Sequence, residues 1–344
     1  MHSIAVAGHL CLDITPPLGD TVRLKPGQLV EVGQLSITLG GSVANTGRAL
    51  ADLGAAVTPY ASIGDDELGA LLLSKLDAQG FGTPRLNVSS QLATSYSLVI
   101  ERPGVDRTFW HHTGANDEFD GTFVRVEGHD LLHVGYPTLL PGVLTDGGRP
   151  LHTLLARARA EGVTTSIDLA VVDRTSSVGS LDWHSILELA FSECDIASPS
   201  FDDLTSALRI DEPYSLALVD RLADRMLDQG VAIVAISAGG HRLRLRTGSA
   251  ARLRRGGRVL APLAETWADQ ALTVPPLWVD NPITTNGAGD ASTAGLLFAL
   301  SGGATPTLAA ALAAASSALV ISGDRPTPAG VTCLEPTLAT LFAP

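Results

Sequence analysis

The sequence predicts an α/β fold, a three-layer sandwich in which helices flank both faces of a mostly parallel central β-sheet. Short apolar runs alternate with helical patterns between residues 131 and 236, as is typical of βαβ units. A chain of 344 residues that is 45% hydrophobic and 17% charged can bury a large core. Two strand-rich regions interrupt the alternation and predict a small β-sheet lid. We therefore expect a single domain, residues 1–344, with a lid formed by about 13–39 and 94–114.

The N-terminal half begins with an apolar strand at residues 3–8, which ends in a glycine turn. An Ala-rich helix follows at 42–53, and Gly54 stands where a helix commonly ends in a left-handed residue. Alternating residues predict a β-hairpin from 94–101 and 106–112. The other elements expected in this half are a strand-like segment at 29–38, a strand at 56–62 and a helix at 66–79.

The C-terminal half shows the clearest alternation of strands and helices. A second β-hairpin is expected at 241–260, where seven arginines predict a solvated surface, with attraction of ATP or a phosphorylated substrate as the alternative. The expected strands lie near 131–134, 164–168, 194–197 and 231–236, and the expected helices near 151–161, 181–191, 201–208, 215–229, 289–301 and 305–321.

Charge and cysteine content exclude several functions. A net charge of −13 argues against nucleic acid as a partner, although an acidic enzyme can still bind ATP through local donors and a metal ion. Cys11, Cys194 and Cys333 form no CxxC pair, which argues against a disulfide framework or zinc cluster and favours a reducing, cytoplasmic location. Glycines and a proline break the Ala-rich stretch 291–321, so we expect no membrane span, and the N-terminus lacks a signal-peptide pattern.

The strongest motif is Thr-Asn-Gly-Ala-Gly-Asp at residues 285–290, directly before a helix. Small residues let the backbone approach a ligand closely, and the first amides of a helix lack internal partners at the positive end of its dipole. Gly287, Ala288 and Gly289 therefore predict an anion hole. Asp290 lies at its mouth, where a carboxylate can take a proton from an alcohol.

An Asp that caps a helix after a Gly-rich turn explains the same residues without any function. The motif is not a Walker A loop, because the chain has only Lys25 and Lys75 and neither follows the required glycines. A dinucleotide-binding Rossmann enzyme is disfavoured because no Gly-x-Gly-x-x-Gly follows the first strand.

Four segments together resemble the ribokinase-like (PfkB) carbohydrate kinases. Residues 287–290 match the end of that family's Asp-Thr-Thr-Gly-Ala-Gly-Asp signature, and residues 40–45, Gly-Gly-Ser-Val-Ala-Asn, resemble its Gly-Gly-x-x-x-Asn segment. Residues 63–69 resemble its Gly-x-Asp-x-x-Gly stretch, and Asp13 follows the first strand as in the family. The four segments occur in the family's order and span nearly the whole chain.

The resemblance implies an ATP-dependent phosphotransferase that acts on an alcohol of a small sugar. Asp290 would be the general base, and the amides of residues 287–289 would stabilise the transferring phosphoryl group. Sugar hydroxyls would be held by Asp13, Gly40, Gly41 and Asn45.

The resemblance also implies ATP and Mg²⁺ as cofactors. Ser200 and Asp203 lie where the family has Pro-Asn-x-x-Glu near the metal, and Ser237 and Gly240 lie where it has Thr-Leu-Gly-x-x-Gly under the nucleotide. Asn286 is placed with the nucleotide and Asp203 with the metal. Thr284 replaces the Asp with which the signature begins, so dependence on a monovalent cation stays open.

Departures from the family leave the acceptor open. Cys11 and Ser42 replace an Asn and a Lys of the ribokinases proper, which argues against ribose itself. The Asn-Gly-Ala-Gly-Asp wording also occurs in nucleoside kinases, so a nucleoside is the alternative acceptor. Residues 200–203 and 237–240 differ from the family's metal and nucleotide motifs, so a pseudokinase that binds a sugar without using ATP is a third interpretation.

The second predicted lid strand carries Trp110, His111 and His112. Adjacent strand residues face opposite sides, so only one histidine can point at a ligand. Trp110 and His112 share a face that is expected either to cover the ligand or to pack within the lid or against a second copy, as a homodimer through the lid.

Overall fold

The computed structural model describes residues 3–18, 26–80, 84–102 and 105–343. Nine strands form the main sheet in the order β13-β12-β11-β10-β9-β8-β1-β4-β5. All neighbours from β11 to β5 are parallel, while β12 and β13 are added antiparallel at one edge. The strands are Ser3–Gly8 (β1), Ala56–Gly64 (β4), Arg85–Ser89 (β5), Leu131–Gly135 (β8), Thr164–Asp168 (β9), Ile196–Ala197 (β10), Ile233–Ile236 (β11), Leu243–Thr247 (β12) and Ala271–Val274 (β13).

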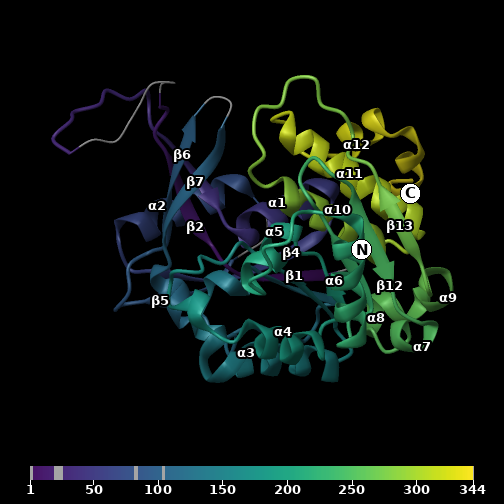
Figure 1. Ribbon diagram of the computed structural model, residues 1–344. Coiled ribbons are helices and arrows are strands. Elements are labelled where there is room, and N and C mark those ends of the chain that lie inside the picture. The colour runs from purple at the N-terminus through teal and green to yellow at the C-terminus, as the bar shows by residue number, and fades with distance from the viewer. Residues whose placement is uncertain (1–2, 19–25, 81–83, 103–104, 344) are drawn as a thin grey trace.

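Helices cover both faces of this sheet, which confirms the three-layer α/β prediction (Figure 1). Alternate residues of β1 feed two separate cores: Ile4 and Val6 pack with α1, α10 and α11, whereas Ala5 and Ala7 pack with α3, α4 and α6. The helices are Ser42–Leu53 (α1), Glu67–Gln79 (α2), Pro141–Ala160 (α3), Trp183–Phe191 (α4), Phe201–Ala207 (α5), Leu216–Asp228 (α6), Ala250–Leu253 (α7), Gly257–Leu260 (α8), Ala264–Trp267 (α9), Ala288–Ser301 (α10), Pro306–Ile321 (α11) and Pro328–Leu334 (α12).

A separate four-stranded sheet forms the predicted lid, in the order β3-β2-β6-β7. Its strands are Cys11–Thr15 (β2), Ser36–Gly40 (β3), Tyr96–Arg102 (β6) and Val105–His112 (β7). The predicted strand 29–38 is shorter than expected, because Leu29 and its neighbours are exposed and only 36–40 pairs with β2. Residues 19–25 of the predicted lid, and 103–104 at the hairpin tip, lie outside the described residues.

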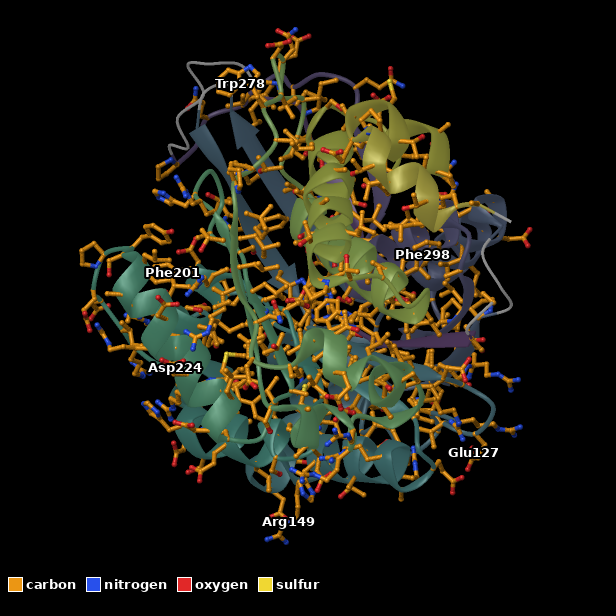
Figure 2. The ribbon with its side chains drawn as sticks, turned by 90° about the vertical axis from the view of Figure 1, so that its right-hand side faces the viewer. Glu127, Arg149, Phe201, Asp224, Trp278 and Phe298 are labelled. Carbon is orange, nitrogen blue, oxygen red and sulfur yellow. The ribbon has the colours of Figure 1, made fainter. Side chains whose placement is uncertain are left out.

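The loop before α10 lies at the end of the molecule where the lid strands project. Its Trp278 is 86% exposed, and Figure 2 shows it far from Arg149 at the opposite end. Among the residues that the structure describes, none of the helices combines the length and the apolar character needed to span a bilayer.

The predicted β-hairpin at 241–260 was wrong. Only its first half is a strand, β12, and that strand pairs with β11 and with β13. The rest forms the short helices α7, α8 and α9 because Leu253, Leu260 and Trp267 are drawn into the core, where the Trp267 indole donates to the Ala304 carbonyl at 2.8 Å. Apolar burial at this spacing suits helical turns and not an alternating strand.

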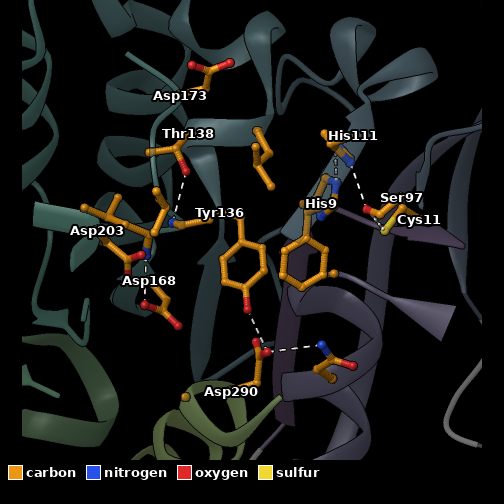
Figure 3. Close-up of a pocket in the computed structure, with 18 of the residues that line it drawn as sticks. His9, Cys11, Ser97, His111, Tyr136, Thr138, Asp168, Asp173, Asp203 and Asp290 are labelled. Carbon is orange, nitrogen blue, oxygen red and sulfur yellow. Dashed lines mark hydrogen bonds between the residues drawn. The ribbon is translucent and has the colours of Figure 1, made fainter. Parts of the chain in front are cut away.

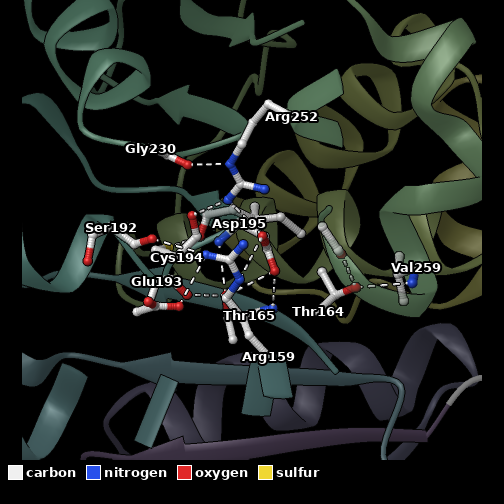
Figure 4. A network of polar contacts seen from close by, with 12 residues as sticks. Arg159, Thr164, Thr165, Ser192, Glu193, Cys194, Asp195, Gly230, Arg252 and Val259 are labelled. Carbon is white, nitrogen blue, oxygen red and sulfur yellow. Dashed lines mark hydrogen bonds and ion pairs between the residues drawn. The ribbon is translucent and has the colours of Figure 1, made fainter. Parts of the chain in front are cut away.

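The arginines of this region divide into two groups. Arg244, Arg246 and Arg252 are partly buried and paired, whereas Arg242, Arg254, Arg255 and Arg258 are exposed, as the sequence predicted. Arg244 and Arg246 both pair with Asp220, at 2.7 and 3.3 Å. Arg252 donates to Asp195, whose carboxylate is fully buried, at 2.7 Å, and to the Cys194 carbonyl at 3.0 Å (Figure 4). Arg244, Arg246 and Arg252 hold the sheet edge to neighbouring helices and loops, so these three stabilise the fold.

Candidate active site

A cavity of about 920 Å³ lies between the main sheet and the lid. Its lining includes residues at or just after the C-terminal ends of the parallel strands: His9 after β1, Tyr136 after β8, and Asp168 at the end of β9. The lid contributes Asp13 and His111 from β2 and β7. Ligands of open α/β sheets commonly bind at the carboxyl ends of the strands, and this cavity has that position.

Asp290 is the third residue of α10 and lines this cavity while being only 2% exposed. Its Oδ1 accepts from the Thr46 hydroxyl at 2.7 Å, and its Oδ2 accepts from the Asn45 amide at 3.1 Å. The Tyr136 hydroxyl also donates to Oδ2 at 2.6 Å (Figure 3). Three side chains from two other elements thus orient one carboxylate toward the cavity.

The surroundings of Asp290 act on its pKa in opposite directions. Burial raises the pKa of this carboxyl, and the hydrogen bonds from Tyr136, Thr46 and Asn45 lower it. The nearby Asp13 carboxylate adds a smaller upward effect on the same pKa. The net shift is upward, which makes the ionised carboxylate a stronger base than an exposed one.

The predicted anion hole has a left-handed turn at Gly287, with φ 77°, directly before α10. The amide of Ala288 donates to the Thr285 carbonyl at 3.3 Å, so that amide closes the turn. The amides of Gly289 and Asp290 lie in the first helical turn, where an α-helix supplies no acceptor. Gly289 is open on its side-chain side, and a Cβ there would meet nothing within 4 Å.

The predicted acceptor residues gather around Asp13. Gly40 lies directly against its carboxyl group, and a Cβ at Gly40 would stand 2.4 Å from the Asp13 Oδ1 atom. Gly41 has φ 86° and lines the cavity, as does Asn45. Asn286, which we expected beside the nucleotide, lines the cavity and donates to the Asp13 Oδ2 atom at 3.2 Å. The Gly-Gly segment at 40–45 and the signature at 285–290 are far apart in the sequence, but both contact Asp13 in the structure.

The predicted nucleotide and metal residues lie on the other side of the cavity. Ser200 and Asp203 form a capping box: the Ser200 amide donates to the Asp203 Oδ2 at 2.8 Å, and the Asp203 amide donates to the Ser200 Oγ at 3.1 Å. Burial raises the pKa of Asp203 to about 7. Ser200, Asp203 and Ser237 line the cavity, whereas Gly240 is exposed in its turn and does not.

No group of three or more His, Cys, Asp or Glu side chains is arranged to hold a metal ion within the described residues. Asp203 can therefore contribute to a Mg²⁺ site only together with phosphate or water oxygens, which is how Mg²⁺ is commonly held. The Oγ1 atom of Thr284 accepts a hydrogen bond from the backbone amide of Asn286 at 3.0 Å, so Thr284 stabilises the turn of the signature segment.

Tyr136, Thr46 and Asp168 were not found by sequence reasoning. Tyr136 has a left-handed backbone, φ 60° and ψ 49°, which is uncommon for a residue other than glycine and is often seen at functional sites. Its position just after a predicted buried strand was the available signal. Asp168 had the same signal at the end of the strand predicted at 164–168.

The lid strand presents His111 to the cavity, and of the two expectations for Trp110 and His112 the structure favours packing within the lid over covering a ligand. His111 lines the cavity, whereas Trp110 is 50% exposed and His112 packs against Tyr96 with ring centroids 5.3 Å apart. Only one of the two adjacent histidines therefore lines the cavity, as predicted, and it is the one on the face opposite to Trp110 and His112.

Comparison with known proteins agrees with this geometry. The family model described as pfkB family carbohydrate kinase matches residues 1–328. The chain belongs to the pfkB family. Its membership agrees with the resemblance carried by the four sequence segments, and the match extends from the first strand through α11.

Solved structures share the pfkB-family fold at low sequence identity. Arabidopsis thaliana ribokinase complexed with ribose and ATP is 16% identical, with a TM-score of 0.74 over 97% of this chain and 98% of that one. The Methanocaldococcus jannaschii nucleoside kinase is 16% identical, with a TM-score of 0.72 over 97% and 98%. A putative ribokinase II from E. coli in complex with ATP and Mg²⁺ is 16% identical, with a TM-score of 0.72 over 99% and 100%.

Proposed function

We propose that this protein transfers the γ-phosphoryl group of ATP to an alcohol of a small sugar or sugar-like molecule, with Asp290 as the general base. The observation that carries the proposal is the Asp290 carboxylate, which faces the cavity at the N-terminus of α10 and is held by Asn45, Thr46 and Tyr136. The unit proposed to act is residues 1–344, with the lid strands over the acceptor.

In the proposed reaction the acceptor lies between the lid and Asp290, near Asp13, Gly41 and Asn45. Asp290 removes the hydroxyl proton as the oxygen attacks, and the amides of Gly289 and Asp290 stabilise charge on the transferring phosphoryl group. Lid closure would exclude water from this centre. Positioning and charge stabilisation are expected to dominate the rate, as in other phosphoryl transfers.

ATP and Mg²⁺ suit the side of the cavity opposite the lid. Ser200, Asp203 and Ser237 line that side and are the residues proposed to contact the phosphates and Mg²⁺. Mg²⁺ would neutralise phosphate charge there. The A. thaliana and E. coli neighbours, which were solved with ATP or with ATP and Mg²⁺, support this choice of cofactors.

A nucleoside is the second candidate acceptor. The M. jannaschii nucleoside kinase has the same fold, as does a Burkholderia thailandensis nucleoside kinase that was solved with inosine. The Asn-Gly-Ala-Gly-Asp segment of residues 286–290 favours the same alternative. A homodimer through the lid remains part of the proposal, since Phe109 and Trp110 on β7 are 43% and 50% exposed.

An ADP-release screen over pentoses, hexoses, keto-acids and nucleosides tests the function. We expect ATP-dependent release of ADP with at least one sugar or nucleoside and none without an acceptor. Thermal stabilisation by adenosine or pseudouridine, but by no free sugar, would select the nucleoside alternative. Sugar binding without any ADP release would favour the pseudokinase and contradict the proposal.

We predict that Tyr136→Phe shifts the pH dependence of the reaction. The Tyr136 hydroxyl donates to the ionised Asp290 carboxylate and so lowers its pKa. Its removal should raise that pKa further, since a hydrogen bond donated to the ionised carboxylate favours the charged form. The base must be deprotonated, so the acidic limb of the kcat/KM–pH profile should move to higher pH. An unmoved acidic limb would show that Tyr136 does not influence the base.

A further inference from the structure

The lid side of the cavity contains a chain of polar contacts that the proposed reaction does not use. His9 places its Nε2 atom 3.3 Å from the Nε2 atom of His111 on β7. The His111 Nδ1 atom lies 3.0 Å from the Ser97 hydroxyl oxygen on β6, and the Cys11 Sγ lies 3.9 Å from that oxygen. Figure 3 shows these four side chains together on one side of the pocket. His9 and His111 are called the imidazole pair below.

The imidazole pair is uncharged near neutral pH. Burial holds the pKa of His9 well below its usual value, and His111 lowers that pKa further. Burial also lowers the pKa of His111 to about 4. One neutral ring can donate from Nε2 while the other accepts, so the two rings satisfy each other there. The pair therefore offers hydrogen-bonding groups without charge.

One nitrogen of the imidazole pair has no partner. Within the described residues the Nδ1 atom of His9 has no hydrogen bond, although the residue is only 2% exposed. Leaving a buried polar atom unpaired is unfavourable, so such an atom is a candidate for ligand contact. It lies beside Gly41, where a Cβ would stand 2.6 Å from it, and Gly41 lines the same cavity. A ligand hydroxyl against Gly41 would satisfy it.

The charges of the cavity disfavour an anion in the same place. Asp117, Asp168, Asp173, Asp203 and Asp290 are among its lining residues, and the described lining residues include no Lys or Arg. A carboxylate or phosphate on the acceptor would lie near Asp290 and gain no opposite charge from those residues. A hydroxyl group avoids this repulsion and can still bind the unpaired Nδ1 atom of His9.

We propose that the Nδ1 atom of His9, whose ring is positioned by His111, binds a hydroxyl group of the phosphoryl acceptor, and that this acceptor is an uncharged polyol and not a sugar acid or a phosphorylated sugar. The inference rests on the proposed kinase function and narrows its substrate class. A free sugar and the ribose of a nucleoside present the same hydroxyl chemistry, so the experiment has an arm for each.

The first experiment measures ADP release with matched pairs: D-glucose and D-glucuronate, D-ribose and D-ribose 5-phosphate, inosine and inosine 5′-monophosphate. We expect the uncharged member of the active pair to have a kcat/KM at least about 100-fold higher, since like charges placed together cost several kcal/mol. ADP release with inosine would identify the ribose of a nucleoside as the group that is bound, whereas ADP release with D-glucose or D-ribose would identify a free sugar. A preferred anionic member would overturn this inference and leave the kinase proposal standing, whereas no ADP release with any pair or with the wider screen would count against both.

The second experiment separates the two nitrogens of His9, using the best acceptor from the first. His9→Asn keeps a polar group near Nδ1, and His9→Gln keeps one near Nε2, where it can still contact His111. We expect His9→Gln to raise the acceptor KM about tenfold and His9→Asn to stay within about threefold, with the KM for ATP unchanged in both. His111→Asn, which loses the contact with His9, should also raise the acceptor KM.

Trp110→Phe is the matched control, because Trp110 precedes His111 on the same strand and faces away from the cavity lining. Its acceptor KM should equal that of the unaltered protein. Equal acceptor KM values in His9→Gln, His111→Asn and Trp110→Phe would overturn the proposed hydroxyl contact. So would parallel changes in the KM values for acceptor and ATP, which would indicate a purely structural role.

Discussion

Replacement of Asp290 by Asn is expected to lower kcat by roughly 10²–10⁴-fold, because the variant has no group able to take the acceptor proton. The amide has nearly the same shape and keeps one oxygen to accept from Thr46. We therefore expect the acceptor KM to change much less than kcat. Initial rates of ADP release at saturating ATP measure both quantities, and binding of the acceptor can be followed by thermal shift.

The competing explanation for Asp290 is that of a helix-capping residue, and the structure disfavours it. The residue before α10 is Gly287, and no side-chain cap is formed there. Asp182 does cap a helix: it precedes α4 and accepts from the Ser185 amide at 3.3 Å. Asp182→Asn is therefore the matched control and should retain normal turnover. Near-normal turnover of Asp290→Asn would remove Asp290 from the role of base.

Much of the fold was predictable because its central strands are buried on both sides. The runs at 3–8 and 164–168 were predicted with the bounds that the structure shows. The first is mostly apolar, as is typical of parallel strands covered by helices, whereas the second, Thr-Thr-Ser-Ile-Asp, is buried but largely polar and is indicated by its β-branched residues. The helix at 42–53 was also predicted with its observed bounds, and Gly54 has the left-handed conformation, φ 104°. Strand β5 was not predicted, because only one of its five residues is buried and its apolar pattern is weak.

The candidate site was predictable where one short segment carries several of its residues. The signature at 285–290 and the Gly-Gly turn at 40–41 indicated the site from local sequence alone. Tyr136 and His9 could not be assigned in this way, because their surroundings are made by segments far apart in the chain. Tyr136 meets Asp290 only when the end of β8 is placed beside the start of α10.

The wrong hairpin at 241–260 has the same kind of cause. Alternating arginines at 242, 244 and 246 suggest a solvated strand, and β12 does form there. Beyond Thr247 the chain folds back, and Arg252 reaches carboxylate and carbonyl oxygens just before the start of β10 and just after the end of α6. A long-range partner decides whether an arginine is on the surface or inside, and sequence spacing does not contain that information.

We expect Arg252→Met to lower the free energy of unfolding by about 3 kcal/mol or more. Asp195 is fully buried, and Arg252 is its closest cationic partner at 2.7 Å, with Arg159 at 3.8 Å. Removal of one member of a buried pair leaves the other charge poorly compensated, which typically costs about 3–5 kcal/mol. The Asp195 Oδ2 atom would keep its bond from the Thr165 amide at 3.0 Å, so the loss should fall near the lower value. Chemical denaturation of both proteins measures the difference.

The matched control is Arg254→Met, two residues further along the chain. Arg254 pairs with Glu265, but both side chains are largely exposed, 58% and 75%. Exposed pairs contribute about 0–1 kcal/mol and are screened by salt, so this variant should be nearly as stable as the unaltered protein. The Arg252 effect should also persist in high salt, because water and ions do not reach Asp195. Equal stabilities of the two variants would show that the buried pair does not stabilise the fold, and that the carboxylate is compensated by Arg159 and the surrounding amides alone.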